Sequence, residues 1–248
     1  GIRDSSVTGV QTCALPIYFN VGLQLLNADS WEERYRLAFD LHFEASENQY
    51  LSGNLDGAFQ ICDLAFSQAK SKLEKSKLYQ LKVKLMLAGT QIELAMETGL
   101  IALKELGVTL SHSPPQELNM QEWAKLPITR DADKLAAMEM LMLMLPSACY
   151  QSSTLAMSIV YNMLKITIKY GNSPPSIFAY AIYACLLCGW LPDIDAGNQF
   201  SDLAELVLAR FNAKGFRPKL AITNLMNIRH WKKHIRERSE EHTSELQS

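Results

Sequence analysis

The sequence has little net charge, few cysteines and no long uninterrupted apolar run. Its formal net charge is −2, so we expect no nucleic-acid partner and no binding to an anionic membrane surface. The longest nearly continuous apolar run, Ile177–Leu191, is shorter than the roughly 20 residues that a membrane-spanning helix needs. We therefore expect no membrane span, and we interpret this run as a helix buried in a protein core.

Cysteine is scarce, and its placement is not that of a disulfide framework. Five cysteines occur, and Cys62, Cys149, Cys185 and Cys188 lie within apolar helical patterns. Free cysteines are usual in such surroundings, which favours a reducing, cytoplasmic compartment. Cys185 and Cys188 form a C-x-x-C pair, but no second pair or nearby histidine completes a redox or metal site. We therefore interpret this pair as packing residues.

Several catalytic motifs are also missing from the sequence. It contains no G-x-x-x-x-G-K-[ST] phosphate loop, no kinase H-R-D or D-F-G, and no nucleophile elbow. No cofactor and no metal is indicated. We expect that the chain itself is not an enzyme and that it does not bind ATP through a known loop.

Both ends of the sequence match, in translation, the two strands of one sequencing adapter. The segment RSEEHTSELQS (238–248) fits one strand, and VTGVQTCALPI (7–17) fits its reverse complement. We interpret residues 1–17 and 238–248 as translated adapter sequence rather than protein. Residues 18–237 are then expected to be a fragment of a larger protein, in which basic and acidic residues are equal in number.

Between these ends, apolar residues recur at helical spacing. Ser30 with Glu33 fits an S-x-x-E capping box at a helix start. We expect Pro146 to end or kink its helix. Helices are predicted over residues 30–51, 55–71, 78–106 with a break near Gly89, 117–124, 131–146, 153–170, 173–191, 195–212 and 219–236.

No segment of useful length shows strand-like alternation, so the predicted class is all-α. Ala58, Ala95 and Ala196 each fall early in the second helix of a predicted hairpin. The separation between Ala58 and Ala95 is near the roughly 34-residue period of tetratricopeptide repeats. We therefore expect an array of antiparallel helical hairpins that resembles a tetratricopeptide superhelix.

The last predicted helix carries a candidate interaction face. His230 and His234 stand one helical turn apart, but a zinc-protease pattern needs glutamate where Trp231 stands, so we interpret the histidines as a solvated or structural pair. The basic side chains are suited to an acidic partner or to another domain of the same chain. An ordinary solvated face is the alternative. The face consists of Arg229, His230, Trp231, Lys232, Lys233 and Arg236.

Methionine and aromatic side chains leave a second alternative open. The chain is a small-ligand sensor if these residues enclose an apolar pocket, since methionine suits adaptable ligand surfaces. A plain helical core is the other interpretation. The residues concerned are Met138, Met140, Met142, Met144, Tyr180, Tyr183 and Trp190.

Several stretches taken together resemble one family. They are LHFEASENQYLSGNLDGAF (41–59), LKELGV (103–108), YGNSPPSIFAYAIYACLLCGWLPDIDAGNQF (170–200) and IRHWKKHIRE (228–237). They resemble the helical region that follows the ATPase module in large bacterial multi-domain kinases. In that family a serine/threonine kinase domain and a signal-transduction ATPase of the AAA type precede the helical region. A GAF sensor domain and a histidine kinase, as in two-component systems, follow it.

The resemblance implies a cytoplasmic, non-catalytic scaffold or signal-relay segment. The implied partners are other domains of the same polypeptide, namely the ATPase, GAF and kinase domains, or separate proteins. The parent protein is expected to be an ATP-dependent serine/threonine and histidine kinase, but none of the kinase or ATPase residues falls within this sequence. Where the family tends to have G-x-x-F-G, residues 197–201 read GNQFS, so one glycine of that pattern is absent.

Overall fold

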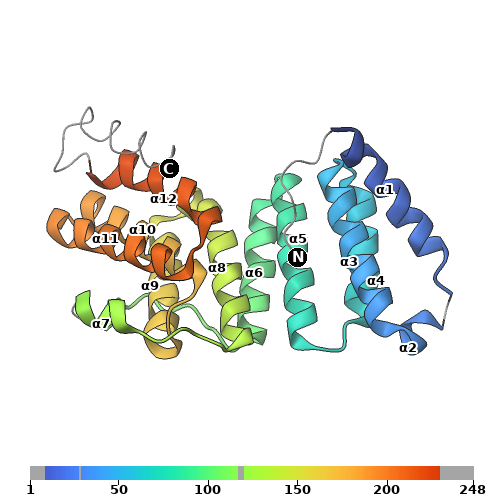
Figure 1. Ribbon diagram of the computed structural model, residues 1–248, viewed down its shortest axis with the longest axis horizontal. Coiled ribbons are helices and arrows are strands. Elements are labelled where there is room, and N and C mark those ends of the chain that lie inside the picture. Colours follow the sequence, from blue (N-terminus) through green and yellow to red (C-terminus); the bar gives the residue numbers. More distant parts are fainter. Residues whose placement is uncertain (1–8, 28, 117–119, 230–248) are drawn as a thin grey trace. The chain divides into compact units, whose positions relative to one another are not determined.

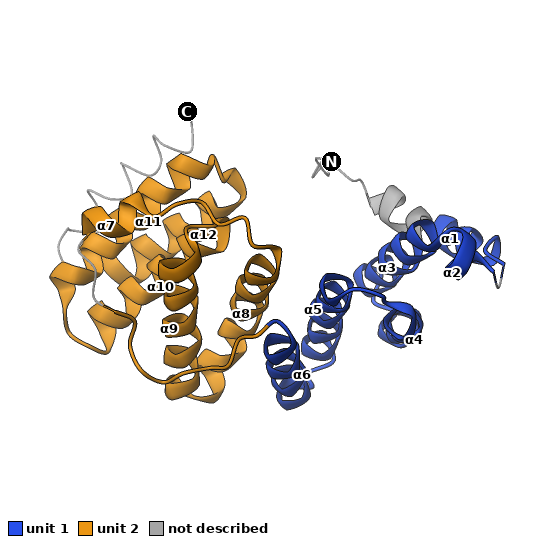
Figure 2. Cartoon of the chain, turned by 90° about the horizontal axis from the view of Figure 1, so that it is seen from below, with its two compact units in different colours: residues 1–106 blue, residues 107–248 orange. Residues whose placement is uncertain are grey.

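The computed structural model describes residues 9–27, 29–116 and 120–229, with side chains from Ile17 onward (Figure 1). Within these residues the chain is mostly helical and no strand forms, although Ile128 and Asn172 make an isolated β-bridge. The prediction of an all-α array of helical hairpins is confirmed. The chain divides into two compact units, unit 1 (1–106) and unit 2 (107–248), which Figure 2 colours separately.

Unit 1 is a succession of hairpins. Each helix packs beside the next one from α3 to α6, and α1 lies against α3. The break predicted near Gly89 is present, and Thr90 adopts a φ of 60° there. The helices are α1 (Gly9–Gln24), α2 (Ser30–Glu33), α3 (Tyr35–Leu51), α4 (Leu55–Gln68), α5 (Lys72–Ala88) and α6 (Ile92–Glu105).

Several helix starts of unit 1 differ from the prediction: α1 was not predicted, the helix predicted over 30–51 is interrupted at Arg34, and α5 begins at Lys72 rather than near residue 78. The predicted capping box at Ser30 and Glu33 is wrong, because Ser30 is already the first residue of α2 and its hydroxyl bonds to Asn27. A capping box occurs instead at the start of α5. There Ser71 Oγ accepts the backbone N–H of Glu74 at 3.1 Å, and Glu74 Oε2 accepts the N–H of Ser71 at 2.9 Å. Reciprocal bonds of this kind satisfy two amides that a helix start leaves free.

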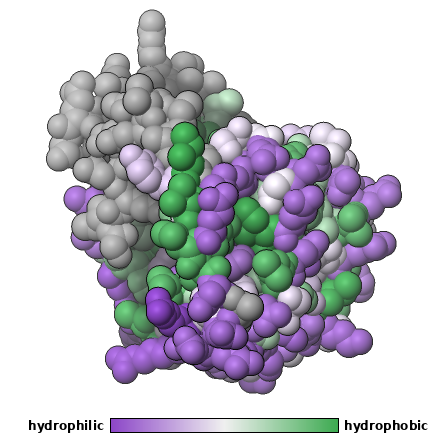
Figure 3. All heavy atoms as spheres, turned by 90° about the vertical axis from the view of Figure 1, so that its right-hand side faces the viewer, coloured by the Kyte–Doolittle hydropathy of each residue, from purple (hydrophilic) through white to green (hydrophobic). Residues whose placement is uncertain are grey.

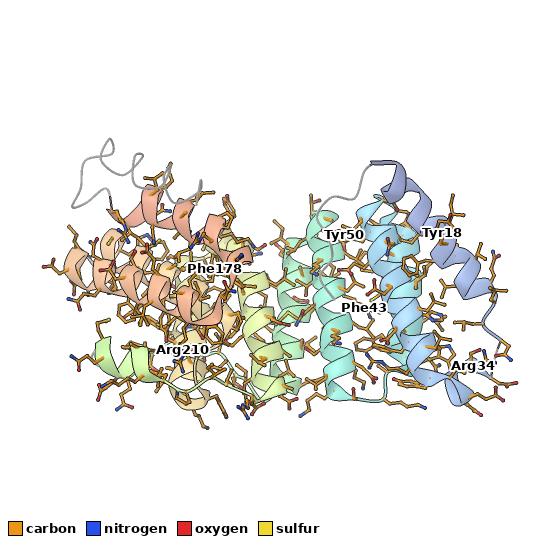
Figure 4. The ribbon with its side chains drawn as sticks, viewed as in Figure 1. Tyr18, Arg34, Phe43, Tyr50, Phe178 and Arg210 are labelled. Carbon is orange, nitrogen blue, oxygen red and sulfur yellow. The ribbon has the colours of Figure 1, made fainter. Side chains whose placement is uncertain are left out.

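The core of unit 1 forms where α3, α4 and α5 meet. Phe43 and Tyr50 lie one above the other on the side of α3 that faces α5 (Figure 4) and pack, half-buried, against this core. Its fully buried members are Phe39, Ala58, Cys62, Ala65, Leu78, Leu81 and Leu85.

Unit 2 is arranged around α10. This helix contacts α8, α9, α11, α12 and both short turns that flank α12, which agrees with the buried helix predicted from its apolar run. Asn172, Ser173 and Ser176 at its start are buried, as is Tyr180. The elements are α7 (Met120–Lys125), α8 (Ala132–Gln151), α9 (Ser153–Tyr170), α10 (Pro174–Gly189), α11 (Ile194–Phe211), η1 (Lys214–Phe216), α12 (Arg217–Thr223) and η2 (Asn224–Ile228).

Pro146 does not end its helix, contrary to one of the two predicted outcomes. Helix α8 continues through it to Gln151. Proline removes one backbone hydrogen bond and crowds the preceding turn. The ring of Pro146 is exposed, while Leu145 and Ala148 on either side are buried, so packing outweighs the local cost.

A small clamp fixes the turn between α9 and α10. Gly171 has a φ of +106°, and the next residue, Asn172, is fully buried. The N–H of Asn172 donates to Pro127 O at 2.6 Å, and the N–H of Thr129 donates to Asn172 O at 2.9 Å. The Asn172 side chain accepts the hydroxyl of Tyr180 at 2.7 Å. These bonds hold the 127–129 segment against the start of α10.

Candidate functional site

Arg229 is the only residue of the predicted basic face that lies within the described part of the chain. Its guanidinium donates to Glu205 at 2.6 Å and to Asp202 at 3.4 Å, both on α11. Glu205 also accepts the side-chain amide of Asn224 at 2.7 Å. Arg229 therefore ties η2 to α11. His230, Trp231, Lys232, Lys233 and Arg236 lie outside the described residues.

The C-x-x-C pair lies within α10, as its sequence context predicted. Cys188 is buried at a close approach of α11: a Cβ atom at Gly197 would collide with Cys188 Sγ and lie 3.0 Å from Ala184 O. Burial, with a smaller contribution from the neighbouring Cys188, raises the pKa of the Cys185 thiol to about 12. A thiol with such a pKa is protonated at neutral pH and is a poor nucleophile or metal ligand. Among the described residues, no group of three or more His, Cys, Asp or Glu side chains is placed to hold a metal.

Several of the residues proposed to line a ligand pocket take part in packing. Met138, Met140 and Met144 are buried. The ring of Tyr180 packs edge-on against Trp123 at a centroid distance of 5.5 Å, and burial raises the pKa of its hydroxyl. Trp190, at the end of α10, is half-exposed and lies outside this packing. The ligand-sensor alternative predicts that these aromatic rings surround one closed pocket, whereas Tyr180 packs against Trp123 and Trp190 is half-exposed.

An exposed apolar stripe on α1 is the surface that internal packing leaves unexplained. Tyr18 and Val21 belong to α1, and Leu25 follows it in a turn, where its N–H still bonds to Val21 O at 3.1 Å. Their spacing of three and four residues places them on one face. They are 72%, 49% and 81% exposed. Figure 3 shows a band of apolar atoms on the side of the molecule where α1 lies, and Figure 4 shows Tyr18 on the side of α1 away from α3. We call these three residues the α1 stripe.

The opposite face of α1 is held on α3. Gly22 lies against Leu41, and a Cβ atom at this glycine would be 3.2 Å from the Leu41 side chain. The Gln49 side chain donates to Asn20 Oδ1 at 3.1 Å. Apolar contact and a hydrogen bond thus fix which face of α1 points outward.

The described part of α1 has no charged face. Residues 17–26 read IYFNVGLQLL, in which only Asn20 and Gln24 are polar. A surface helix of a globular protein usually has one apolar stripe, which faces the core. Helix α1 has a second one, which is exposed, beside a narrow polar side with Asn20 and Gln24. The α1 stripe is therefore suited to packing against another helix. Complete burial of one such side chain contributes about 1.5–3 kcal/mol.

Sequence reasoning missed the α1 stripe, although a signal was present. Two apolar sets, one at 18, 21 and 25 and another at 19, 22, 23 and 26, run along the same helix. Their combination leaves only a narrow polar side, which carries Asn20 and Gln24. Deciding which set faces outward requires the contact between Gly22 and Leu41.

Comparison with known proteins gives a distant similarity. No established family profile matches the chain, and no solved structure does. None of the described helices has the length and hydropathy of a membrane span. The chain is 19% identical over 237 residues to hybrid signal transduction histidine kinase G of Dictyostelium discoideum. The alignment covers 79% of this chain and 7% of the kinase. The chain is therefore similar to a small part of a much longer signal-transduction protein.

Proposed function

We propose that the chain is a non-catalytic helical scaffold or signal-relay segment of a larger signal-transduction protein. The similarity to a hybrid signal transduction histidine kinase supports the signalling context. The hairpin array supports a role in contacts, because stacked helices present extended surfaces for recognition. We further propose a tetratricopeptide-like region associated with an AAA-type ATPase in a cytoplasmic, bacterial-type multi-domain kinase.

The observation that carries this proposal is the α1 stripe. Its occupant, in our proposal, is an amphipathic helix from another segment of the same polypeptide. The stacking of hairpins in unit 1 supports a helix as the occupant, because α1 packs on α3 through the same kind of apolar surface that it presents outward. The absence of charge from residues 17–27 favours apolar helix packing over pairing with a charged segment.

The test compares the chain alone with the longer protein encoded by its parent gene. Hydrogen exchange at residues 18–25 is measured in both. We expect slower exchange in the longer protein, because a covering helix excludes water from the α1 stripe. Replacing both Val21 and Leu25 with Glu should abolish this difference.

Leu64→Glu is the matched control, since Leu64 is also an apolar residue of unit 1 and is exposed to nearly the same degree as Val21. It should leave the difference in exchange unchanged. Equal exchange in both proteins would contradict the proposal, as would a parent gene without signalling domains. Sedimentation that shows dimers of the chain formed through the α1 stripe would assign that surface to a second copy instead.

A further inference from the structure

The sequence contains the tripeptide Ser-Pro-Pro twice, at 113–115 and at 173–175. A proline directly after a serine is the feature that proline-directed protein kinases recognise, so both serines qualify by sequence. The structure places them in opposite environments. Ser113 is exposed in the loop that precedes α7, whereas Ser173 is 1% exposed at the start of α10.

Ser173 takes part in a network of buried hydrogen bonds at the start of α10. Its hydroxyl lies 3.1 Å from Ser176 Oγ, and its N–H donates to the same oxygen at 3.0 Å. Ser176 Oγ is in turn 2.9 Å from Thr167 Oγ1 on α9. All three hydroxyls are buried. A kinase could reach Ser173 only after the start of α10 had opened.

Ser113 is an exposed residue at a bend in the loop, which is held along α9. Lys165 Nζ donates to Ser113 Oγ at 2.8 Å and to Ser111 Oγ at 3.0 Å. The side-chain amide of Asn162 donates to Ser111 O at 2.9 Å, and His112 Nδ1 contacts the hydroxyl of Ser158. These contacts anchor residues 111–113 along α9, while Ser113 remains exposed.

The cation beside Ser113 is well placed to receive an anion. The partners of Lys165 are the two serine hydroxyls, and no carboxylate of the described residues lies within ion-pair distance of its ammonium. A phosphate on Ser113 replaces a neutral acceptor by a group that carries about −1.5 to −2 charge at pH 7. Hydrogen bonds between an ammonium and a phosphate are shorter and stronger than those to a neutral hydroxyl.

We propose that Ser113 is a phosphorylation site for a proline-directed serine/threonine protein kinase, and that Lys165 holds the phosphate against α9. In this reaction the γ-phosphoryl group of ATP is transferred to Ser113 Oγ. The bond between the γ-phosphorus and the bridging oxygen breaks, the new Oγ–P bond forms, the hydroxyl proton is released and ADP leaves. The assignment does not depend on the α1 stripe.

The first test uses the folded chain, ATP and a purified proline-directed kinase. Peptide mapping by mass spectrometry should find one phosphate, on Ser113, and none on Ser173. Synthetic peptides spanning 109–117 and 169–177 should both accept phosphate, because the fold alone distinguishes the two serines. Pro114→Ala should abolish modification of the folded chain, and Ser111→Ala should leave it intact. An unmodified Ser113, or equal modification of Ser173 in the folded chain, overturns the assignment.

The second test concerns Lys165. The phosphorus NMR signal of phosphorylated Ser113 is titrated in the parent chain and in Lys165→Met. The second pKa of a phosphoserine is about 6, and an adjacent ammonium lowers it by favouring the dianion. We expect a lower phosphate pKa in the parent chain than in Lys165→Met. Equal values show that Lys165 does not hold the phosphate and overturn that part of the proposal, while circular dichroism confirms that both proteins are folded.

Discussion

The backbone at Gly171 disfavours any residue with a side chain, for two separate reasons. Its φ of +106° and ψ of 174° lie in a region that is essentially restricted to glycine. A Cβ atom there would also overlap Pro127 O and lie 3.0 Å from the N–H nitrogen of Thr129. Both neighbours are backbone atoms held by the clamp with Asn172, so neither can move away by changing a rotamer.

We therefore predict that Gly171→Ala lowers the free energy of unfolding of unit 2 by about 3 kcal/mol, since strain and overlap add. Urea denaturation monitored by hydrogen exchange of α9 and α10 peptides measures this loss.

Gly107→Ala is the matched control in the same unit. Gly107 also has a positive φ, 71°, but a Cβ atom there would meet only the flexible Lys134 ammonium at 3.6 Å. It should cost about 1 kcal/mol, the usual penalty for a left-handed alanine. If both variants lost a similar free energy of unfolding, the overlap with Pro127 would not add to the cost at Gly171.

At the scale of a helix, the start of α5 is the best-defined capping site in unit 1. Glu74 Oε2 accepts the N–H groups of Ser71 and Lys70 as well as the hydroxyl of Tyr35 on α3, the last at 2.8 Å. The cap therefore fixes α5 both to its own first turn and to the neighbouring hairpin.

Ser71→Ala should lower the free energy of unfolding by about 1 kcal/mol, because the N–H of Glu74 loses its acceptor. Ser67→Ala provides a comparison near the end of α4, where the hydroxyl is exposed and bonds only to Leu64 O. That change should stay within about 0.5 kcal/mol. Chemical denaturation followed by circular dichroism distinguishes the two, and equal effects would argue against the capping box.

Much of the element order was predictable because helical periodicity is local. The bounds of α9 coincide with the predicted helix over 153–170, since Gly171 stops it. The absence of a capping box at Ser30 could not be predicted, because the S-x-x-E spacing does not reveal that the serine hydroxyl bonds to Asn27 instead. The continuation of α8 through Pro146 could not be predicted for a related reason. It depends on the burial of Leu145 and Ala148, which other helices provide.

The candidate surfaces were less predictable than the helices. Arg229 was predicted to belong to a basic interaction face, but a charge pattern in one segment cannot reveal the acids supplied by another. Asp202 and Glu205 lie one helical turn apart on α11 and engage Arg229. The α1 stripe could not be predicted for the same reason, because only the contact with α3 shows which face of α1 is buried and which is exposed.

At the scale of the whole molecule, the reactivity of the thiols measures how well the core of each unit is shielded from solvent. Cys62 lies in the core of unit 1, while Cys149, Cys185 and Cys188 belong to α8 and α10 of unit 2. Burial raises the pKa of Cys62 to about 12, so at pH 8 about one thiol in ten thousand is ionised, against roughly a quarter for an ordinary cysteine.

We predict that alkylation at pH 8 modifies Cys149 first, because it is the exposed thiol of the four. Cys62 and Cys188 should react slowest. The measurement is time-resolved mass spectrometry on a chain with Cys13→Ser, so that only these four thiols report. In concentrated urea all four should react at similar rates. Rapid modification of Cys62 in the folded chain would contradict the hairpin core.

The bridge between Ile128 and Asn172 has a consequence for folding kinetics. It joins two points of the chain that are separated by the whole of α8 and α9. Closing a loop of that length costs chain entropy before any contact compensates for it. The two helices must therefore fold back on each other before the bridge can close. We therefore expect the bridge to form after the rate-limiting barrier, where an interaction affects the unfolding rate alone. Weakening the clamp at Asn172 should then accelerate unfolding of unit 2 and leave its refolding rate almost unchanged, which stopped-flow unfolding and refolding would measure.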